Sequence, residues 1–287
     1  MSSLPTPLVT TDWLADHLAD ADLRLLDATI FLAPPAGPGE DWTQERGDVA
    51  HAEEHIPGSR YADLVSELST DDGWFSRPGA ESFAAAVERL GIGDGMKVVV
   101  YDRAASMWAT RVWWLLRSYG FDDVAVLDGG FPRWKAEGRP TTDEPTPAAP
   151  VATFTPCDRP ELVASTADVL AVVNDGGACL INSLTAEDFS ATETDRYARP
   201  GRIPGSLNVP VFDLLATDGT FRSPEELREH FADVLAQPGR KITYCGGGIA
   251  ATGDALALYL LGEEDVAIYD GSLREWTSDA SLPLEVG

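Results

Sequence analysis

The sequence predicts an α/β protein made of two similar halves, each a parallel sheet flanked by helices. Two observations support this prediction. Short runs of β-branched and aromatic residues alternate with helical patterns, which is typical of parallel sheets with helices on both faces. Four segments of the first half also recur in the same order in the second half, which indicates an internal duplication.

The repeated segments define the two halves. The first half contains LRLLDA (23–28), HIPGS (55–59), VVVYD (98–102) and DGGFPRW (128–134), and the second half contains ACLINS (178–183), RIPGS (202–206), ITYC (242–245) and DGSLREW (270–276). Between the halves, residues 140–160 are rich in Pro, Thr and Ala without a periodic pattern, so we expect an exposed linker there. The expected domains are residues 1–139 and 161–287.

Helical patterns cover residues 80–90, 109–118, 224–235 and 250–261. Each of them follows or precedes a short β-type run, which predicts that the strands are joined by helical crossovers. In sheets of this kind the active site lies at the carboxyl ends of the strands.

The candidate nucleophile lies in the stretch KITYCGGGIAATGDALALYLL (241–261). A short β-type run ends at Cys245, three glycines follow, and an apolar helical pattern then continues to Gly262. Inward-facing amides of a glycine turn and the positive end of the oncoming helix would both stabilise an anion at the sulfur. We therefore expect Cys245 to be a nucleophile held by the loop amides. The structural alternative, a small buried cysteine beside a flexible turn, stays open.

The remaining cysteines do not suggest a disulfide or a metal site. The chain has three cysteines among 287 residues, namely Cys157, Cys179 and Cys245, with no CxxC pair and no His/Cys ligand spacing. We expect Cys157 and Cys179 to be inert, and we expect no metal or organic cofactor.

The charge and hydropathy limit the partners and the location. A formal net charge of −26 argues against nucleic acid and against an anionic membrane surface as partners. There is no run of 18 apolar residues, and the acidic N-terminus has no basic or apolar leader region, so a cytoplasmic location is expected. The sequence gives no indication of the oligomeric state.

Several of these segments together resemble the two-domain rhodanese-type sulfurtransferases over nearly the whole chain. They are LLDA, HIPGS, RVWWLLRSYG, DGGFPRW, RPGRIPGSLNVP, YCGGGIAAT and YDGSLREW. The resemblance implies two tandem rhodanese-like domains, each with a five-stranded parallel sheet, of which only the second is catalytic. The repeat agrees, because Asp102 stands in the place of Cys245 and a carboxylate cannot form a persulfide.

The resemblance also implies a reaction. A Cys245 persulfide would carry a sulfane sulfur from thiosulfate or 3-mercaptopyruvate to a thiophilic acceptor such as cyanide or a thiol. The partners would then be a small-molecule donor and acceptor. The implied substrate-binding groups are the amides of the loop, contributed by Gly246, Gly247, Gly248, Ile249 and Ala250.

The chain departs from the family pattern near the expected site. The loop lacks the basic residues typical of thiosulfate enzymes, and Gly247 replaces the serine typical of mercaptopyruvate enzymes. After the first strand of the second half, Asn182 and Asp188 stand where the family often has an aspartate and an arginine. The candidate replacement cations are Arg196, Arg199 and Arg202, with surface solvation as an equal alternative for each.

Two other functions and one further residue role remain to be considered from the sequence. The changed charges at Asn182 and Asp188 would also suit a non-catalytic rhodanese-like binding module. A cysteine-dependent phosphatase or arsenate reductase needs an arginine six residues after the cysteine, where Ala251 stands, so that chemistry is disfavoured. His55, before the first IPGS segment, could transfer protons, but a structural role is favoured.

Overall fold

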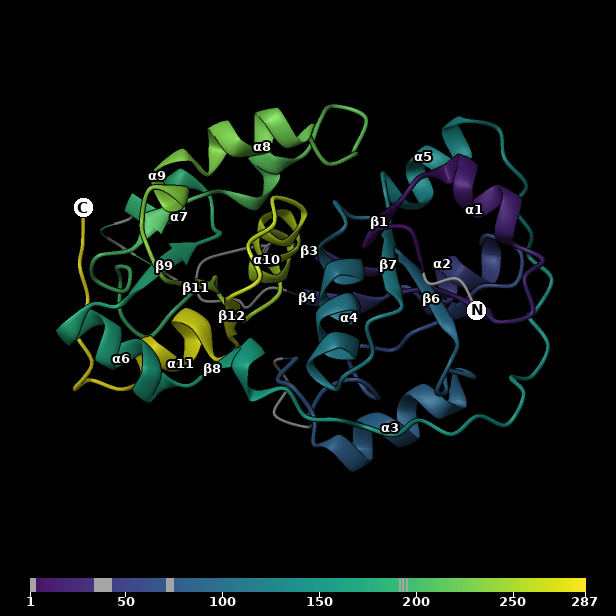
Figure 1. Ribbon diagram of the computed structural model, residues 1–287, viewed down its shortest axis with the longest axis horizontal. Helices are drawn as coiled ribbons and strands as arrows, with labels where there is room; N and C mark the ends of the chain where they lie inside the picture. The colour runs from purple at the N-terminus through teal and green to yellow at the C-terminus, as the bar shows by residue number, and fades with distance from the viewer. Residues whose placement is uncertain (1–3, 34–42, 71–74, 191, 193, 195) are drawn as a thin grey trace. The chain divides into compact units, whose positions relative to one another are not determined.

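The computed structural model describes residues 4–33, 43–70, 75–190, 192, 194 and 196–287 (Figure 1). The chain divides into two compact units. Up to residue 159 the described residues belong to the first unit, and from residue 160 they belong to the second, with residues 217–220 grouped with the first. Each unit is described by itself.

The first unit contains a five-stranded parallel sheet. Its strands lie in the order β1 (Leu8–Val9), β7 (Val124–Leu127), β6 (Lys97–Tyr101), β2 (Leu23–Asp27) and β5 (Arg60–Tyr61). A separate antiparallel pair consists of β3 (Ile30–Ala33) and β4 (Thr43–Arg46). The helices are α1 (Thr11–His17), α2 (Asp48–Glu53), α3 (Ala80–Arg89), α4 (Met107–Ser118) and α5 (Gly130–Ala136).

The second unit repeats this sheet. Its strands lie in the order β10 (Leu207–Asn208), β9 (Ala178–Asn182), β11 (Arg240–Tyr244), β12 (Val266–Tyr269) and β8 (Val163–Ala164), again all parallel. The α-helices are α6 (Thr166–Asp175), α7 (Ala186–Ser190), α8 (Pro224–His230), α9 (Ala232–Leu235), α10 (Ala250–Leu260) and α11 (Ser272–Ser278). Two 3₁₀ turns are η1 (Pro160–Leu162) and η2 (Val211–Leu214). The predicted α/β fold with two tandem parallel sheets is confirmed.

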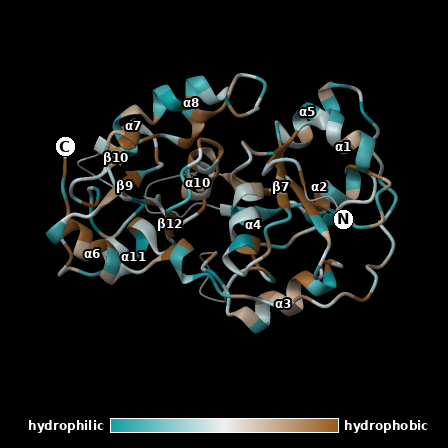
Figure 2. Cartoon of the chain, in the orientation of Figure 1, coloured by the Kyte–Doolittle hydropathy of each residue, from teal (hydrophilic) through white to brown (hydrophobic). Residues whose placement is uncertain are grey.

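The central strands are buried in the core of each unit, and the sheet regions in Figure 2 are coloured largely as hydrophobic. In β6 the residues from Val98 to Tyr101 are fully buried, and in β11 Ile242 and Tyr244 are buried as well. Strands buried on both faces read as continuous apolar runs, which is why these segments stand out in the sequence. One face of the second sheet packs against Trp276 and Leu273 of α11 and Val169 of α6.

The predicted helices agree closely with the structure except for one. The pattern over residues 224–235 predicts a single helix, whereas the structure has α8 and α9 with a break at Phe231. Phe231 has φ −95° and ψ 13°, which lies outside the helical region, and its side chain is fully buried. Burial of this ring therefore overrides the local helical preference.

The same hydrogen bonds recur in both units. The Tyr101 hydroxyl lies 2.8 Å from Ser59 Oγ, and the Tyr244 hydroxyl donates to Ser206 Oγ at the same distance. These two serines end the HIPGS and RIPGS segments. Each segment is thus anchored to the tyrosine that precedes the functional position at the end of the central strand.

Residues 140–159, most of the expected linker, are hydrogen-bonded to the first unit. The Thr142 amide and carbonyl pair with His55, the Phe154 amide donates to Glu88, and the Cys157 amide donates to the Tyr119 carbonyl. Most of the stretch is exposed, but the Phe154 side chain is only 4% exposed. The segment therefore packs along the surface of the first unit.

Within the described residues, no helix is long and apolar enough to cross a membrane.

Candidate active site

Cys245 lies directly after β11, at the carboxyl end of the central strand of the second sheet. Its amide donates to Ser272 Oγ at 3.1 Å, and its carbonyl accepts from the Leu273 amide at 3.1 Å. The next carbonyl, that of Gly246, accepts from the Arg274 amide at 3.0 Å. The start of α11 therefore fixes the backbone that carries the thiol.

Asp102 has the equivalent position in the first unit. Its carbonyl accepts from the Phe131 amide at 3.0 Å, as the Cys245 carbonyl does from Leu273. Its carboxylate accepts four backbone amides at 2.8–3.1 Å, namely those of Ala104, Ser106, Trp108 and Ala109. Complete burial raises the pKa of Asp102 to about 6, and the amide hydrogen bonds oppose this rise. This loop thus surrounds an anion with inward-facing amides.

The start of α10 can be aligned with that of α4 through a shared hydrogen bond. The hydroxyls of Thr110 and Thr252 each donate to the carbonyl three residues earlier, at 2.9 and 2.7 Å. Ala250 and Ala251 therefore correspond to Trp108 and Ala109, whose amides bind the Asp102 carboxylate. The loop between is one residue shorter in the second unit.

Most of the backbone amides that follow Cys245 have no acceptor among the described residues. Those of Gly246, Gly247, Ile249, Ala250 and Ala251 donate to no acceptor among the residues that the structure describes. The N-cap residue Ile249 has no side-chain capping bond. Unpaired amides at a helix start attract anions. The second loop therefore offers donors at the place where the first loop holds a carboxylate.

Tyr197 was missed by the sequence analysis. A Cβ atom built on Gly246 would lie 2.5 Å from the Tyr197 hydroxyl oxygen, so this hydroxyl covers the first loop residue. Cys245 itself is only 3% exposed. Burial raises the pKa of Tyr197, and the negative charges of Cys245 and Asp188 raise it further. The sequence signal was slight: an aromatic residue within the polar segment RYARPGRIPG.

The three candidate arginines have different surroundings. Arg196 pairs with Asp188 on α7, with Nη1 at 3.1 Å from Oδ1, and its charge acts on Tyr197. Arg199 donates instead to the backbone carbonyls of Trp276, Thr277, Asp279 and Leu282.

Arg202 also contacts the C-terminal segment. It donates to the carbonyls of Phe189 and Gly287, pairs with Glu285, and stacks on the Phe189 ring. Of the three candidate arginines, Arg196 lies directly before Tyr197 and its charge acts on the Tyr197 hydroxyl, whereas the hydrogen bonds of Arg199 and Arg202 go mainly to the C-terminal part of the second unit.

Asn182 keeps a turn that an aspartate forms in the first unit. Its Oδ1 accepts from the Leu184 amide at 2.9 Å, just as Asp27 Oδ1 accepts from the Thr29 amide at 3.0 Å. An uncharged amide thus preserves the acceptor that shapes this turn. The change removes one negative charge from the end of β9, next to β11.

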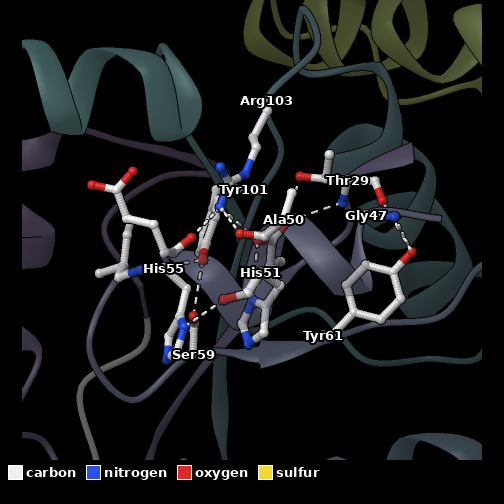
Figure 3. A network of polar contacts seen from close by, with 12 residues as sticks. Thr29, Gly47, Ala50, His51, His55, Ser59, Tyr61, Tyr101 and Arg103 are labelled. Carbon is white, nitrogen blue, oxygen red and sulfur yellow. Dashed lines mark hydrogen bonds and ion pairs between the residues drawn. The ribbon is translucent and has the colours of Figure 1, made fainter. Parts of the chain in front are cut away.

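A polar network lies at the corresponding end of the first unit (Figure 3). Its two histidine rings stack with centroids 4.2 Å apart. His51 Nδ1 lies 3.1 Å from Asp27 Oδ2, and His55 Nδ1 lies 2.7 Å from the His51 carbonyl oxygen. Arg103 donates to the carbonyl of Ala50 in α2 and to that of Glu54, the residue just after the helix. Burial lowers the pKa of His55, which favours its neutral form.

Two cavities of about 400 and 270 Å³ adjoin α2 in the first unit. Neither is lined by the cysteine loop, so cavity size does not identify the candidate site here.

The other cysteines have different surroundings: Cys157 is exposed, and burial raises the pKa of Cys179. Among the described residues, no group of three or more His, Cys, Asp or Glu side chains is arranged to hold a metal ion.

Comparison with known proteins agrees with this geometry. The model of the rhodanese-like domain matches residues 10–137 and 182–279. The thiosulfate sulfurtransferase of Cricetulus griseus is 36% identical over 286 residues, covering 95% of this chain and 92% of that protein. The 3-mercaptopyruvate sulfurtransferase of Escherichia coli K12 is 33% identical over 294 residues, covering 98% of both.

A solved structure extends the agreement to three dimensions. SseA from Escherichia coli, described as a 3-mercaptopyruvate sulfotransferase with the rhodanese fold, has a TM-score of 0.80 and 30% identity. The match covers 93% of this chain and 98% of SseA. The chain therefore belongs to the rhodanese family, as a sulfurtransferase with two tandem rhodanese-like domains.

Proposed function

We propose that the protein moves a sulfane sulfur from thiosulfate or 3-mercaptopyruvate to a thiophilic acceptor through a persulfide on Cys245. The observation that carries this proposal is the contrast between the two loops. In the first, four amides bind the Asp102 carboxylate; in the second, the corresponding amides of Ala250 and Ala251 have no described acceptor, and a cysteine stands where the first loop has its aspartate. A thiolate or persulfide is the anion that such a loop would hold.

Cys245 is the only protein group that forms and breaks covalent bonds in the proposed chemistry. With thiosulfate, the Cys245 thiolate attacks the outer sulfur, a new S–S bond forms, and the old S–S bond breaks with its electron pair leaving on sulfite. With 3-mercaptopyruvate, the C–S bond breaks and its electron pair stays on the pyruvate enolate, which takes up a proton. Cyanide or a thiol then attacks the outer persulfide sulfur, and Cys245 leaves as thiolate.

The loop amides would supply most of the stabilisation. A hydrogen bond to a charged group contributes about 1.5–3 kcal/mol, whereas a helix start contributes about 0.3–1 kcal/mol. Several amides from Gly246 to Ala250 can therefore stabilise both the thiolate and the charge that develops on the leaving group. Of the candidate arginines, we assign a supporting role near the site to Arg196, and a structural role to Arg199 and Arg202.

The proposal assigns the two domains different tasks. The second, residues 161–287, carries the reaction, and the first, residues 1–139, is non-catalytic because Asp102 replaces the cysteine. A small-molecule donor and acceptor are the proposed partners. The expectations of a cytoplasmic location, and of no nucleic-acid or membrane partner, rest on the sequence alone.

Intact-mass measurement tests the assignment of Cys245. The purified protein is incubated with thiosulfate or with 3-mercaptopyruvate, and we expect the mass to increase by one sulfur atom. Cys245→Ser should take up none, whereas Cys157→Ser, which removes the exposed thiol, should behave like the unchanged protein. Sulfur retained by Cys245→Ser would disprove the assignment.

A further inference from the structure

We infer that Tyr197 is a further catalytic residue, whose hydroxyl donates a hydrogen bond to the anionic sulfur held on Cys245. The inference rests on the proposed persulfide function. It adds a side-chain hydrogen-bond donor to the backbone amides of the loop, because the three glycines supply none. Its basis is the position of the hydroxyl, which occupies the space where a side chain at residue 246 would begin. A neutral phenol thereby stands where a basic loop residue would otherwise project.

The hydroxyl is available as a donor. Tyr197 makes no hydrogen bond to any other residue in the part of the chain that the structure describes. Burial and the charge of Cys245 both raise its pKa, so the phenol keeps its proton when the sulfur is anionic. A protonated hydroxyl beside an anion forms a charge-assisted hydrogen bond, which is stronger than one between neutral groups.

Neighbouring residues hold Tyr197 over the loop. Arg196, directly before it, is paired with Asp188 on α7. Arg199, two residues after it, is bound to four carbonyls between Trp276 and Leu282. The ring itself packs against the buried cluster that includes Tyr244. Two of the candidate arginines thus serve as positioning residues for the tyrosine.

The Tyr197 hydroxyl can occupy its position only because residue 246 is a glycine without a side chain. An alanine at 246 would place its Cβ 2.5 Å from the hydroxyl oxygen but 3.4 Å from the ring carbon Cζ. Removal of the hydroxyl would therefore leave room for that methyl group. This gives a double-mutant cycle in which the two substitutions must not be additive.

The first experiment uses Tyr197→Phe, which removes only the hydroxyl. The thiolate of Cys245 is followed by ultraviolet absorbance against pH, with Cys245→Ser as the blank, and kcat/KM is measured with each donor. We expect the thiolate to form at higher pH and kcat/KM to fall roughly tenfold to a hundredfold. Tyr269→Phe, which removes the hydroxyl near Thr166, is the matched control and should change neither.

The second experiment completes the cycle. Gly246→Ala alone should displace Tyr197 and lower kcat/KM about as much as Tyr197→Phe, while the double variant should be no worse than either single variant. Unchanged titration and kcat/KM in Tyr197→Phe, or full additivity in the cycle, would overturn the inference. If the proposed function is wrong, the protein without substitutions will gain no sulfur in the intact-mass experiment. The pH titration of the Cys245 thiolate still tests the role of Tyr197 in that case.

Discussion

Asp102 and Cys245 occupy the same position in the two units, and the carbonyl of each accepts a hydrogen bond from the second residue of the helix after the next strand, Phe131 of α5 or Leu273 of α11. In one unit the anion is a permanent part of the loop. In the other, the proposed anion is the reacting sulfur. The duplicated fold therefore provides an internal reference for the site, because the first loop shows which amides such a turn directs inward.

The pH dependence of stability should report on the Asp102 carboxylate. Its folded pKa of about 6 lies above the ordinary value of 3.8, so the folded state binds the proton more tightly than the unfolded state. The stability contributed by this group is therefore present below about pH 4 and is lost as pH rises to about 6. We expect the Asp102→Asn variant to show no such decrease in stability between about pH 4 and pH 6, because its amide does not titrate.

Urea unfolding at pH values from 4 to 7 measures the effect. The free energy of unfolding of the unchanged protein, relative to Asp102→Asn, should decrease across this range. Asp16→Asn, at an exposed position of α1 in the same unit, serves as the control and should give no such difference. A flat difference between the protein and Asp102→Asn would show that the buried carboxyl does not titrate in this window.

Asp254 is a second buried carboxyl, on α10. Its Oδ2 accepts from Ser183 Oγ at 2.7 Å, but its Oδ1 has no partner among the described residues, and complete burial raises the pKa well above 3.8. The charged form is thus disfavoured in the folded state. Because the raised folded pKa makes stability fall as pH rises above about 4, Asp254→Asn should stabilise the protein at pH 8 relative to the unchanged chain.

Thermal unfolding at pH 5 and pH 8 checks this prediction. The gain in Tm from Asp254→Asn should be larger at pH 8 than at pH 5. Asp233→Asn on the exposed face of α9 provides the comparison, with an expected change close to zero at both pH values. A loss of stability at pH 8 in Asp254→Asn would contradict the assignment.

Much of this architecture was visible in the sequence. Strand and helix alternation predicted both sheets, and the order of strand, cysteine, glycines and helix placed Cys245 at the end of β11. The break at Phe231 was not predictable, because it depends on a ring buried by tertiary packing. Likewise, the contact of Tyr197 with Gly246 joins segments far apart in the chain, and no local pattern encodes it.

The arginines illustrate the same limit. Their charge suggested an anion site, but charge alone does not reveal which partner a side chain reaches. Arg199 is bound by backbone carbonyls of the C-terminal segment, so Arg199→Ala should leave these acceptors unpaired and destabilise the protein by roughly 2–3 kcal/mol. Arg196→Ala breaks a more exposed ion pair and should cost less than about 1 kcal/mol.

Urea unfolding of the two variants distinguishes these roles. The free energy of unfolding should fall clearly in Arg199→Ala and little in Arg196→Ala, while kcat/KM should fall in Arg196→Ala because Tyr197 loses a neighbour that holds it. Equal destabilisation by both substitutions would contradict the structural role assigned to Arg199.

Ser272 combines an unfavourable backbone with a needed hydroxyl. Its φ is +51°, in the left-handed region, and its hydroxyl accepts from the Cys245 amide while donating to the Tyr269 carbonyl. In the first unit the equivalent residue is Gly130, with φ +57°, which adopts this conformation without strain. The serine therefore retains a strained backbone and supplies a hydrogen bond to the residue that carries the thiol.

Two substitutions separate these effects. Ser272→Ala keeps the positive φ and leaves the Cys245 amide unpaired, so the free energy of unfolding should fall by about 2 kcal/mol. Ser272→Gly also loses the hydroxyl but relieves the strain, so its loss should be about 1 kcal/mol smaller. Both should lower kcat/KM, because the Cys245 backbone loses a fixed contact, and urea unfolding with donor kinetics measures the two properties. Equal stability of the alanine and glycine variants would mean that the left-handed conformation costs nothing here.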